Sequence, residues 1–445
     1  MNLNFSFFKR GVELKSGKGT FKLEYPEPVW QSFLAERDFF LDNMAYLGTV
    51  CMPLVSNVSK ITYNTAKPFF RKEFDKSVIR DIPSAVEEYK QTAREMLDMF
   101  MKTWHIFPEG RIKKPVFNAK TGERAIIPFS CGKDSMLTMA VCDEIGLNPV
   151  PVYINDTVSP SENRLKLGVI RKIAKEKNLD FAIVRNEIEK LNDFEFWGMP
   201  EADAGYAHMI MGFCFLSLPL AKFYSAGHIV LGNELDLNDT LVSKDGIRCY
   251  PSYDQSFEGT KRLRRIIKKA TRGKVGVTSV ISPLYDLGIM KVLHKRYPEL
   301  GKHQSSCPGL DDSREKRWCM KCPDCARFYV YMKALNMDPK SIGMAKDILD
   351  KKSLKHHTLF NPKKRGRYDK AGSDDDTKFA YYLAYRNGAR GYVMDLFKKK
   401  FFDEINEKEG RLYRKYFSVH SARLIPRKIR KKVVPIYREE LGKTI

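Results

Sequence analysis

Six consecutive residues, Ser130 to Ser135 (SCGKDS), form the stretch of this chain whose residue types are best suited to chemistry. They follow the apolar segment Ala125–Phe129 and precede the helical pattern of Met136–Ile145, so they join an expected strand to an expected helix. A loop in that position directs backbone N–H groups and the positive end of the helix toward an anion. Gly132 permits close approach of a phosphate, and the two serine hydroxyls can donate to its oxygens.

The same loop also carries a cation and a carboxylate. Lys133 supplies a point charge for a phosphate, and Asp134 is a natural partner for a Mg²⁺ ion that bridges phosphates. The spacing is not that of a P-loop or of a dinucleotide-binding loop, because the required glycines are absent. Two alternatives remain open: an ordinary strand–helix turn that holds polar residues, and a nucleophilic role for Cys131.

A second group of reactive side chains lies later in the chain. Four of the nine cysteines fall within a short window, namely Cys307, Cys319, Cys322 and Cys325. Four thiolates complete a tetrahedral shell with no open position, which is typical of a structural zinc site. An iron–sulfur cluster is the main alternative. A disulfide framework is not expected, because the cysteine count is odd and the first residues lack the order of a secretory signal.

Alternating strands and helices are expected to position both groups. Short apolar strands alternate with longer helical patterns: strands at 125–129, 150–155, 181–185, 228–231 and 277–281, and helices at 136–145, 161–177 and 207–223. This rhythm predicts an α/β fold with a parallel sheet flanked by helices. Ligands of such sheets bind at the carboxyl ends of the strands.

Three regions are expected along the 445 residues. Residues 123–345 hold the alternating elements and the cysteine cluster. Residues 1–122, with an amphipathic helix expected at 84–104, are expected to form a mainly helical cap or docking region. Residues 346–445 are expected to contain a linker at 361–376, where the composition is rich in charge, Gly and Pro, and then a basic, mainly helical tail.

The charge balance is strongly basic, with 78 Lys and Arg against 54 Asp and Glu, a net charge of +24. Such an excess favours polyanionic partners such as RNA, and the basic run Arg423–Lys432 is the candidate contact. That run interleaves with Ile425, Ile429 and Val433, which also suits a basic helix packed on the protein. A solubility role is the plain alternative for the charge.

No apolar stretch reaches the length of a membrane span. The nearest is Met209–Ala221, which we expect to be a buried helix. Because the chain also starts without a secretory signal, the cytoplasm is the expected compartment.

The loop Ser130–Ser135 resembles the Ser-Gly-Gly-x-Asp-Ser signature of the N-type ATP pyrophosphatases, or PP-loop enzymes, with Cys131 in place of a glycine. The resemblance implies an adenine nucleotide alpha hydrolase-like fold and cleavage of ATP to AMP and pyrophosphate, which activates a substrate as its adenylate. It also implies that the loop holds the pyrophosphate part of ATP together with Mg²⁺. A cysteine at 131 is expected to fit only if that position has a negative φ.

Further site residues follow from this resemblance. It places the nucleoside of ATP beside two chain segments, namely Tyr153, Ile154 and Asn155 at the end of one strand, and Gly232 and Asn233 after another. His208 and Glu234 are candidate acid and base groups, although a structural hydrogen bond is the plain alternative for a lone histidine. Asp254 and Glu258 could contact substrate, but a solvated surface position is the simpler expectation for both.

A PP-loop followed by four cysteines is similar to two branches of the family. One comprises the 7-cyano-7-deazaguanine synthases. The other comprises the ATP-dependent UDP-N-acetylmuramoyl-L-alanyl-L-glutamate epimerases, which also have an N-terminal domain. The likeness to the epimerases covers about residues 120 to 340 and includes the segments 205–208 (GYAH), 232–234 (GNE), 253–258 (YDQSFE) and 318–325 (WCMKCPDC). Both branches imply a small-molecule carboxylate as the activated substrate.

Two other functions stay open at this point. A PP-loop enzyme that modifies tRNA would adenylate a base oxygen, and the net charge of +24 suits an RNA partner. A binding protein with a degenerate loop would explain Cys131 as a sign of lost activity. Self-association is expected from the resemblance, since many enzymes of this kind form homo-oligomers.

Overall fold

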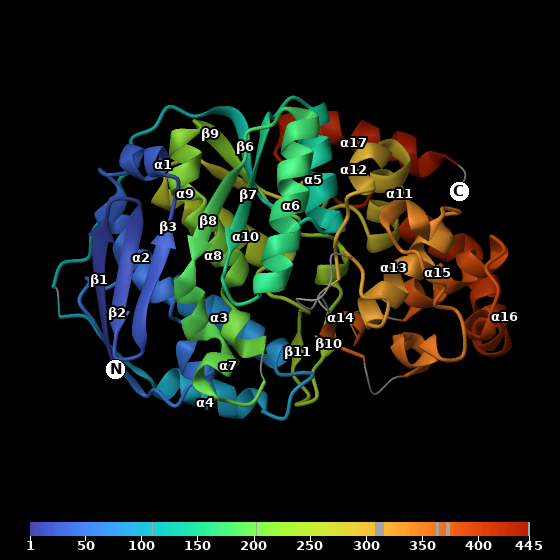
Figure 1. The fold of residues 1–445 in the computed structure, drawn as a ribbon, viewed down its shortest axis with the longest axis horizontal. Helices are drawn as coiled ribbons and strands as arrows, with labels where there is room; N and C mark the ends of the chain where they lie inside the picture. The colour runs from blue at the N-terminus through green and yellow to red at the C-terminus, as the bar shows by residue number, and fades with distance from the viewer. Residues whose placement is uncertain (109, 202, 308–315, 362–364, 371–373, 444–445) are drawn as a thin grey trace.

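The computed structural model of this chain describes residues 1–108, 110–201, 203–307, 316–361, 365–370 and 374–443. Ten strands form one central sheet in the order β12-β9-β6-β7-β8-β3-β2-β1-β4-β5. Most neighbouring strands of this sheet are parallel, and helices flank it (Figure 1). The predicted α/β class with a parallel sheet is confirmed.

Five parallel strands form the half of the sheet that carries the loop. They are β6 (Gly122–Pro128), β7 (Pro149–Asn155), β8 (Ala182–Asn186), β9 (Ala226–Val230) and β12 (Gly276–Thr278). Their middles are short buried runs such as Ala125–Ile127, as expected for strands that are covered on both faces. The helices between them include α5 (Lys133–Glu144) and α6 (Pro160–Lys177). Each predicted strand–helix alternation in this half is present.

One predicted helix in this half is divided in two. The segment expected as a single helix at 207–223 forms α8 (Met209–Leu216) and α9 (Leu218–Phe223). Ser217 separates them, and Pro219 lies in the first turn of α9, where its missing N–H costs no hydrogen bond.

The N-terminal region is not helical alone, because five strands that were not predicted accompany its helices. It adds three antiparallel strands, β1 (Asn2–Phe8), β2 (Gly11–Ser16) and β3 (Gly19–Glu24), and β3 pairs with β8. Two more strands, β4 (Lys60–Tyr63) and β5 (Trp104–Ile106), extend the sheet beyond β1. The region therefore continues the central sheet instead of forming a separate cap, and Figure 1 shows its strands at the sheet's edge.

Four helices of the N-terminal region accompany these strands. They are α1 (Glu27–Ser32), α2 (Arg37–Leu47), α3 (Arg71–Ala85) and α4 (Ala93–Lys102). The single helix predicted at 84–104 is wrong, because α3 ends at Ala85 and α4 begins after Thr92. The Thr92 side chain accepts from the backbone N–H of Glu95, and the Glu95 side chain accepts from Thr92, which is a capping box.

In the rest of the chain, the described residues beyond 346 form helices, turns and loops, with no strand among them. Before that point lie a two-stranded sheet, β10 (Leu241–Val242) with β11 (Arg248–Cys249), and the helices α10 (Phe257–Ala270), α11 (Asp286–Arg296), α12 (Pro298–Gly301) and α13 (Pro323–Ala334). After it lie α14 (Arg367–Lys370), α15 (Asp375–Arg386), α16 (Tyr392–Tyr416) and α17 (Arg427–Gly442). The predicted helical character of the C-terminal region is confirmed.

The basic tail is a packed helix. In α17 the side chains of Ile429, Val433 and Tyr437 are buried, while Lys428 and Lys431 are exposed. The Tyr437 hydroxyl donates to the carbonyl of Val280 at 3.2 Å. The apolar residues of this run therefore hold the helix on the protein. Most of its lysines and arginines face solvent, although Lys432 donates to the carbonyl of Ile145 at 2.9 Å.

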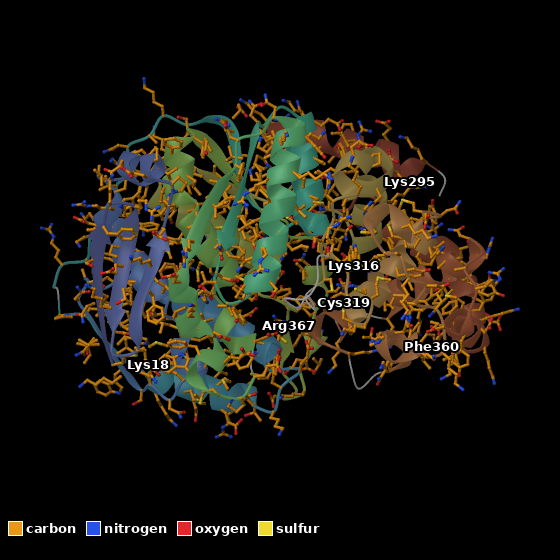
Figure 2. The ribbon with its side chains drawn as sticks, viewed as in Figure 1. Lys18, Lys295, Lys316, Cys319, Phe360 and Arg367 are labelled. Atoms are coloured by element: carbon orange, nitrogen blue, oxygen red, sulfur yellow. The ribbon has the colours of Figure 1, made fainter. Side chains whose placement is uncertain are left out.

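A linker was predicted at 361–376, where the structure describes all residues except 362–364 and 371–373. For the described residues this prediction is wrong. Arg367 in α14 forms ion pairs with Asp81 at 3.8 Å and with Asp203 at 3.4 Å. Lys370 pairs with Glu87 at 2.6 Å. Figure 2 shows Arg367 toward the middle of the molecule. Charged side chains thus fasten this segment to the N-terminal half.

One segment of the described chain, Asp203–Phe223, is long and apolar enough to cross a membrane. Of its most apolar window, 78% is buried inside the structure. Such burial is typical of a core helix in a globular protein.

Candidate active site

The loop Ser130–Ser135 connects the carboxyl end of β6 to the first turn of α5. Gly132 is the residue before the helix, and the first turn of α5 has no side-chain cap. Its free backbone N–H groups and the positive end of the helix dipole face the loop, which is the arrangement that binds anions. The Ser130 and Ser135 hydroxyls lie 3.4 Å apart beside it. The predicted position of the loop, between a strand and the first turn of a helix, is confirmed.

Cys131 has a φ of 61°, so the expectation of a negative φ at this position is wrong. A non-glycine residue in the left-handed region costs about 1 kcal/mol or more. The carbonyl of Cys131 accepts a hydrogen bond from the backbone N–H of Ser305 at 2.8 Å, which stabilises the turn. Burial raises the pKa of its thiol to about 12. The thiol therefore stays protonated at neutral pH, which disfavours a nucleophilic role.

Lys133 lies among three carboxylates. Its Nζ atom is 2.7 Å from Asp134, 2.6 Å from Glu234 and 2.5 Å from Asp286. The side chain is only 6% exposed. Burial lowers the pKa of Lys133, but the three carboxylates outweigh that effect and raise it well above its usual value. The lysine is therefore a fixed cation in the first turn of α5.

The three carboxylates that surround Lys133 also lie close to one another. Ligand oxygens of Asp134, Glu234 and Asp286 all lie within 4.8 Å of one another, a spacing that could hold a metal ion. Burial raises the pKa of Glu234 well above its usual value, and the other two acids raise it further. Oxygen ligands of this kind suit Mg²⁺. Glu234 was predicted as a site residue, whereas Asp286, the first residue of α11, was not.

Gly232 lies against the start of α5. A Cβ atom added to it would lie 3.0 Å from the Cβ of Asp134 and 3.4 Å from the backbone nitrogen of Ser135. The turn after β9 therefore approaches the loop as closely as it does because position 232 has no side chain. This contact brings Glu234, two residues later, to Lys133.

Two adjoining cavities meet at the loop. The first, which we call the loop cavity, has a volume of about 410 Å³ and is lined by Lys133, Asp134, Glu234 and Asp286. The second, which we call the strand-end cavity, has a volume of about 370 Å³ and is lined by residues that include Tyr153, Ile154, Gly232 and Asn233. Both contain Ser130, Asp134, Glu162, Lys166 and Gln255 in their walls.

The remaining predicted residues lie at some distance from these cavities or have structural partners. Asn155 lines neither cavity, and its side chain accepts from the backbone N–H of Thr157 at 3.2 Å. Asn233 donates to the Thr260 hydroxyl at 3.0 Å. Its position at the wall of the strand-end cavity is therefore fixed by a buried hydrogen bond.

His208 is buried in a separate cavity of about 40 Å³. Its Nε2 atom lies 3.6 Å from the Glu189 carboxylate and 3.5 Å from the Asn192 side chain. The structure thus places it outside the walls of both cavities at the loop.

Asp254 and Glu258 differ from each other. The expectation that both lie on a solvated surface is wrong for Asp254, which is buried. Burial and the nearby Asp81 carboxylate raise the pKa of Asp254 to about 7. Glu258 is partly exposed and forms an ion pair with Arg80.

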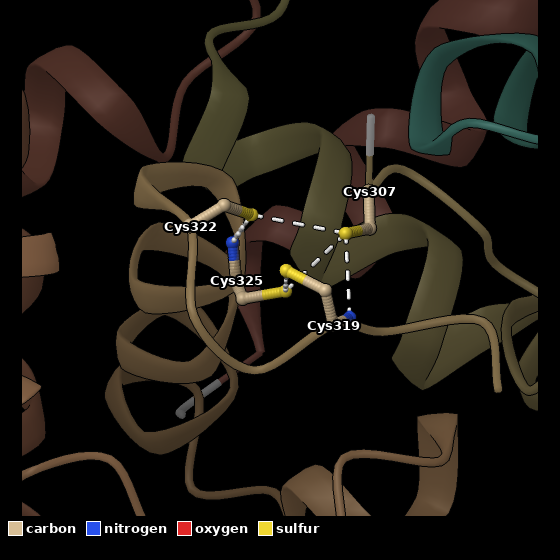
Figure 3. A group of neighbouring side chains, drawn as sticks. All are labelled: Cys307, Cys319, Cys322 and Cys325. Atoms are coloured by element: carbon tan, nitrogen blue, oxygen red, sulfur yellow. Dashed lines mark hydrogen bonds between the residues drawn. The ribbon is translucent and has the colours of Figure 1, made fainter. Parts of the chain in front are cut away.

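The four cysteines converge on one point, as Figure 3 shows. The Sγ atom of Cys307 lies 3.7 Å from that of Cys322 and 3.6 Å from that of Cys325, and Cys319 and Cys325 are 3.8 Å apart. Sulfurs that surround one ion tetrahedrally with bonds of about 2.3 Å are about 3.8 Å apart. The cysteines could therefore hold a single metal ion, and this spacing is compatible with zinc.

An iron–sulfur cluster fits the cysteines less well. In such a cluster the cysteines bind different iron atoms, which spreads the sulfurs farther apart than around a single ion. Here all four Sγ atoms lie within 4.8 Å of one another. Backbone N–H groups also point at the sulfurs, for example that of Cys325 at the Sγ of Cys322 at 3.4 Å. Such bonds stabilise thiolates that bind a metal.

The cysteine cluster adjoins the loop cavity. Cys307 lines that cavity, and Ser305, two residues earlier, holds the carbonyl of Cys131. The helix α13 begins at Pro323, within the cluster, and brings Asp324 and Arg327 to the cavity wall. The cluster therefore holds one side of the candidate site without offering an open ligand position.

Several residues of the candidate site had no sequence signal that identified them. They come from segments with no motif and include Asp236, Asp286, Arg327, Tyr368, Asp369, Asp376 and Tyr416. Asp286 could have been found from its place shortly after the last strand, because the ends of parallel strands meet at one edge. The residues after 365 had no such signal.

No protein-family model matches this chain, and a comparison with curated proteins finds no similar sequence. The functional argument therefore depends on the fold and on the geometry of the site.

Proposed function

We propose that this protein is an ATP pyrophosphatase that activates the carboxylate of a small molecule as its adenylate. The observation that carries the proposal is the position of the loop Ser130–Ser135, at the start of α5 and between two adjoining cavities. One cavity has the size for a nucleoside, with both apolar and polar residues in its walls, and the other holds the three carboxylates and Lys133. An adenylating enzyme needs both, since the α-phosphate must lie between nucleoside and acceptor.

In this proposal, different residues around the two cavities bind different parts of ATP. Tyr153, Ile154 and Gly232 line the space for adenine and ribose. The N–H groups at the start of α5 and the Ser130 and Ser135 hydroxyls bind the pyrophosphate part of ATP. Asp134, Glu234 and Asp286 would hold Mg²⁺, which supplies charge neutralisation of the phosphates.

The reaction is an in-line displacement at the α-phosphorus. An oxygen of the substrate carboxylate forms a bond to this phosphorus, and the bond between phosphorus and the bridging oxygen of pyrophosphate breaks. Pyrophosphate leaves with the electron pair. Lys133 provides a fixed positive charge where negative charge develops on the leaving group, because its three carboxylate partners prevent it from losing its proton.

At the cysteine cluster we propose zinc in a structural role. The sulfur spacing supports a single tetrahedral ion, and four thiolates leave no ligand position for a substrate. The ion would hold the segment around Ser305, and with it the turn at Cys131, in place.

The test measures nucleotide products. Purified protein is incubated with ATP, Mg²⁺ and a metabolite extract, and AMP and pyrophosphate are quantified. We expect both products with the native chain and at least a hundredfold less with Asp134→Asn, since that change removes one of three clustered carboxylates. Asp143→Asn, at the exposed end of the same helix, is the matched control and should keep full activity. Formation of ADP instead of AMP would overturn the proposal.

RNA is the second candidate substrate, with adenylation of a base oxygen. Exposed basic side chains on α17 favour it, among them Arg427, Lys428, Lys431, Lys432 and Arg438. Against it, nine acidic and three basic residues line the loop cavity within the described part of the chain. Total RNA added in place of the metabolite extract tests this candidate, and AMP formation in that arm alone would support it. Binding should then weaken steeply with salt.

A further inference from the structure

The loop cavity is acidic although the protein as a whole carries a net charge of +24. Among the residues that the structure describes, three basic ones line it, Lys133, Lys166 and Arg327. Nine acidic residues line it as well: Asp134, Glu162, Glu234, Asp236, Asp239, Asp286, Asp324, Asp369 and Asp376. A cavity of this charge in a basic protein favours a cationic ligand.

Most of these acidic residues already have a partner. Lys133 pairs with three of them, as described above, and Lys166 forms an ion pair with Glu162. Asp324 pairs with Arg327 at 2.7 Å, and Asp239 pairs with Lys415 at 3.8 Å. Asp369 accepts from the backbone N–H of Gly366 at 3.2 Å. These groups are therefore already engaged, by a side-chain cation, by a backbone N–H group or, for the three partners of Lys133, also by the proposed Mg²⁺ ion.

Asp236 and Asp376 are different. Neither has a cationic side chain within 4.0 Å among the described residues. Asp236 accepts a single hydrogen bond, from the backbone N–H of Asp286 at 2.8 Å. Lys415 and Arg327 act on Asp376 only from a longer distance. The cavity therefore contains two carboxyl groups without a directly paired cation, and burial raises the pKa of both, that of Asp376 to about 6.

Tyr416 provides an independent sign of a ligand at the same place. It lines the loop cavity and is only 2% exposed, yet its hydroxyl has no hydrogen-bond partner in the part of the chain that the structure describes. Asp376 and Asp236 both lie close enough to act on its pKa. A buried hydroxyl without a partner costs about 1 to 3 kcal/mol unless a ligand or a water satisfies it.

We propose that Asp236, Asp376 and Tyr416 bind the ammonium group of an organic amine, and that this amine is the acceptor of the acyl group. The inference rests on the proposed function and adds the class of the second substrate. A primary ammonium donates three hydrogen bonds, and these residues offer three oxygen acceptors that are not otherwise occupied. The neutral phenol hydroxyl favours an ammonium over a second Mg²⁺, which prefers carboxylate, carbonyl and water oxygens.

The reaction then forms an amide. The ammonium loses one proton to a carboxylate of the cavity, and the nitrogen lone pair forms a bond to the carbonyl carbon of the acyl-adenylate. The bond between that carbon and the phosphate oxygen breaks, and AMP leaves with the electron pair. The nitrogen loses its second proton, so that acyl-adenylate and ammonium give amide, AMP and two protons.

The experiment separates the two substrates by charge. A metabolite extract is passed over a cation-exchange resin at neutral pH, which gives a retained cationic fraction and a flow-through with anions and neutral molecules. AMP formation is then measured with ATP, Mg²⁺ and either fraction or both. We expect sustained AMP formation only when both fractions are present. For Asp376→Asn and Tyr416→Phe we expect half-maximal rate at an amount of cationic fraction about tenfold higher or more.

Asp375→Asn is the matched control, because this neighbouring carboxylate pairs with Lys408 and Arg411 and does not line the cavity. It should respond to the cationic fraction as the native chain does. Incorporation of labelled pyrophosphate into ATP with the flow-through alone reports the first step, and it should persist in Asp376→Asn and Tyr416→Phe.

The outcomes distinguish the two proposals. No AMP with the unfractionated extract and no pyrophosphate incorporation would mean that the proposed function is wrong. Full AMP formation with the flow-through alone would overturn the amine proposal and leave the adenylation intact. The same holds if added ammonium chloride replaces the cationic fraction, or if Asp376→Asn changes only the Mg²⁺ dependence of the rate.

Discussion

The backbone N–H of Ser305 donates to the carbonyl of Cys131 at 2.8 Å, and this one bond joins two segments that are far apart in the sequence. Cys131 belongs to the anion-binding turn, and Ser305 lies two residues before the first cysteine of the cluster. Because Cys131 has a left-handed φ of 61°, the turn needs such support to keep its shape. The conformation of the turn therefore depends on the order of the cysteine cluster.

Loss of the metal should consequently reduce the reaction at the loop. We expect the native chain to contain about one zinc ion per molecule, and Cys322→Ser to lose most of it, because a structural zinc site needs all four ligands. AMP formation should fall at least tenfold in that variant. Zinc content by mass spectrometry and the AMP assay check this. Cys249→Ser, in the strand β11 and outside the cluster, is the control. Full activity of a metal-free Cys322→Ser protein would contradict the coupling.

Lys133→Met should destabilise the fold and make its stability depend on Mg²⁺. The change leaves three clustered carboxylates without their buried cation, a loss of about 3 to 5 kcal/mol. A divalent cation bound between them should restore much of this. Thermal unfolding with and without Mg²⁺ is the measurement. Lys166→Met removes the cationic partner of one carboxylate only, that of Glu162, so the loss of stability should be smaller. An unfolding temperature of Lys133→Met that Mg²⁺ does not raise would speak against a cation at this place.

Gly232→Ala should impair activity with little effect on stability. Its added methyl group would meet the Cβ of Asp134 at 3.0 Å and so displace the first turn of α5 or the turn that carries Glu234. We expect AMP formation to fall about tenfold or more, since small displacements of catalytic groups are costly. Gly410→Ala in α16 has only Arg414 nearby, at 3.9 Å, and should gain up to about 1 kcal/mol of stability. Equal activity of the two variants would rule out the close approach.

Asp254 should make the protein less stable as the pH rises. Its folded-state pKa of about 7 lies above the ordinary value of 3.8, because burial disfavours the charged form. The folded state therefore holds a proton that the unfolded state has already lost, and the free energy of unfolding falls between about pH 4 and pH 7. Asp254→Asn should remove part of that fall, on the order of a few kcal/mol. Chemical denaturation at pH 5 and pH 8 measures it, and an unchanged pH dependence would disprove the assignment.

The sequence was sufficient for the half of the fold that carries the loop. Each strand there is a short apolar run followed by a helix, so the periodicity alone placed β6, β7 and β9, and the residue types within 130–135 indicated the anion site. The spacing of the cysteines indicated one metal site. The φ of Cys131 was not predictable, because a bond from Ser305, far along the chain, supports it.

The rest of the sheet and of the site depends on contacts between residues far apart in the sequence, which the local sequence pattern does not predict. The strand β1 does alternate exposed and buried residues over Asn2–Phe5, a signal that was available, but its pairing with β2 and the pairing of β3 with β8 are tertiary. The residues of the C-terminal region that line the loop cavity were not predicted, because charged, glycine-rich sequence resembles a linker. Ion pairs such as Lys370 with Glu87 fix that segment instead.

The central claim is cleavage of ATP between its α- and β-phosphates, and incorporation of labelled pyrophosphate into ATP tests it most directly. The measurement needs only the first step, so it works before the acyl acceptor is known. With Mg²⁺ and the anionic fraction of a metabolite extract, we predict labelled ATP from the native chain and from Asp143→Asn, and none from Asp134→Asn. Absence of label in ATP together with release of ADP and inorganic phosphate by the native chain would contradict the account.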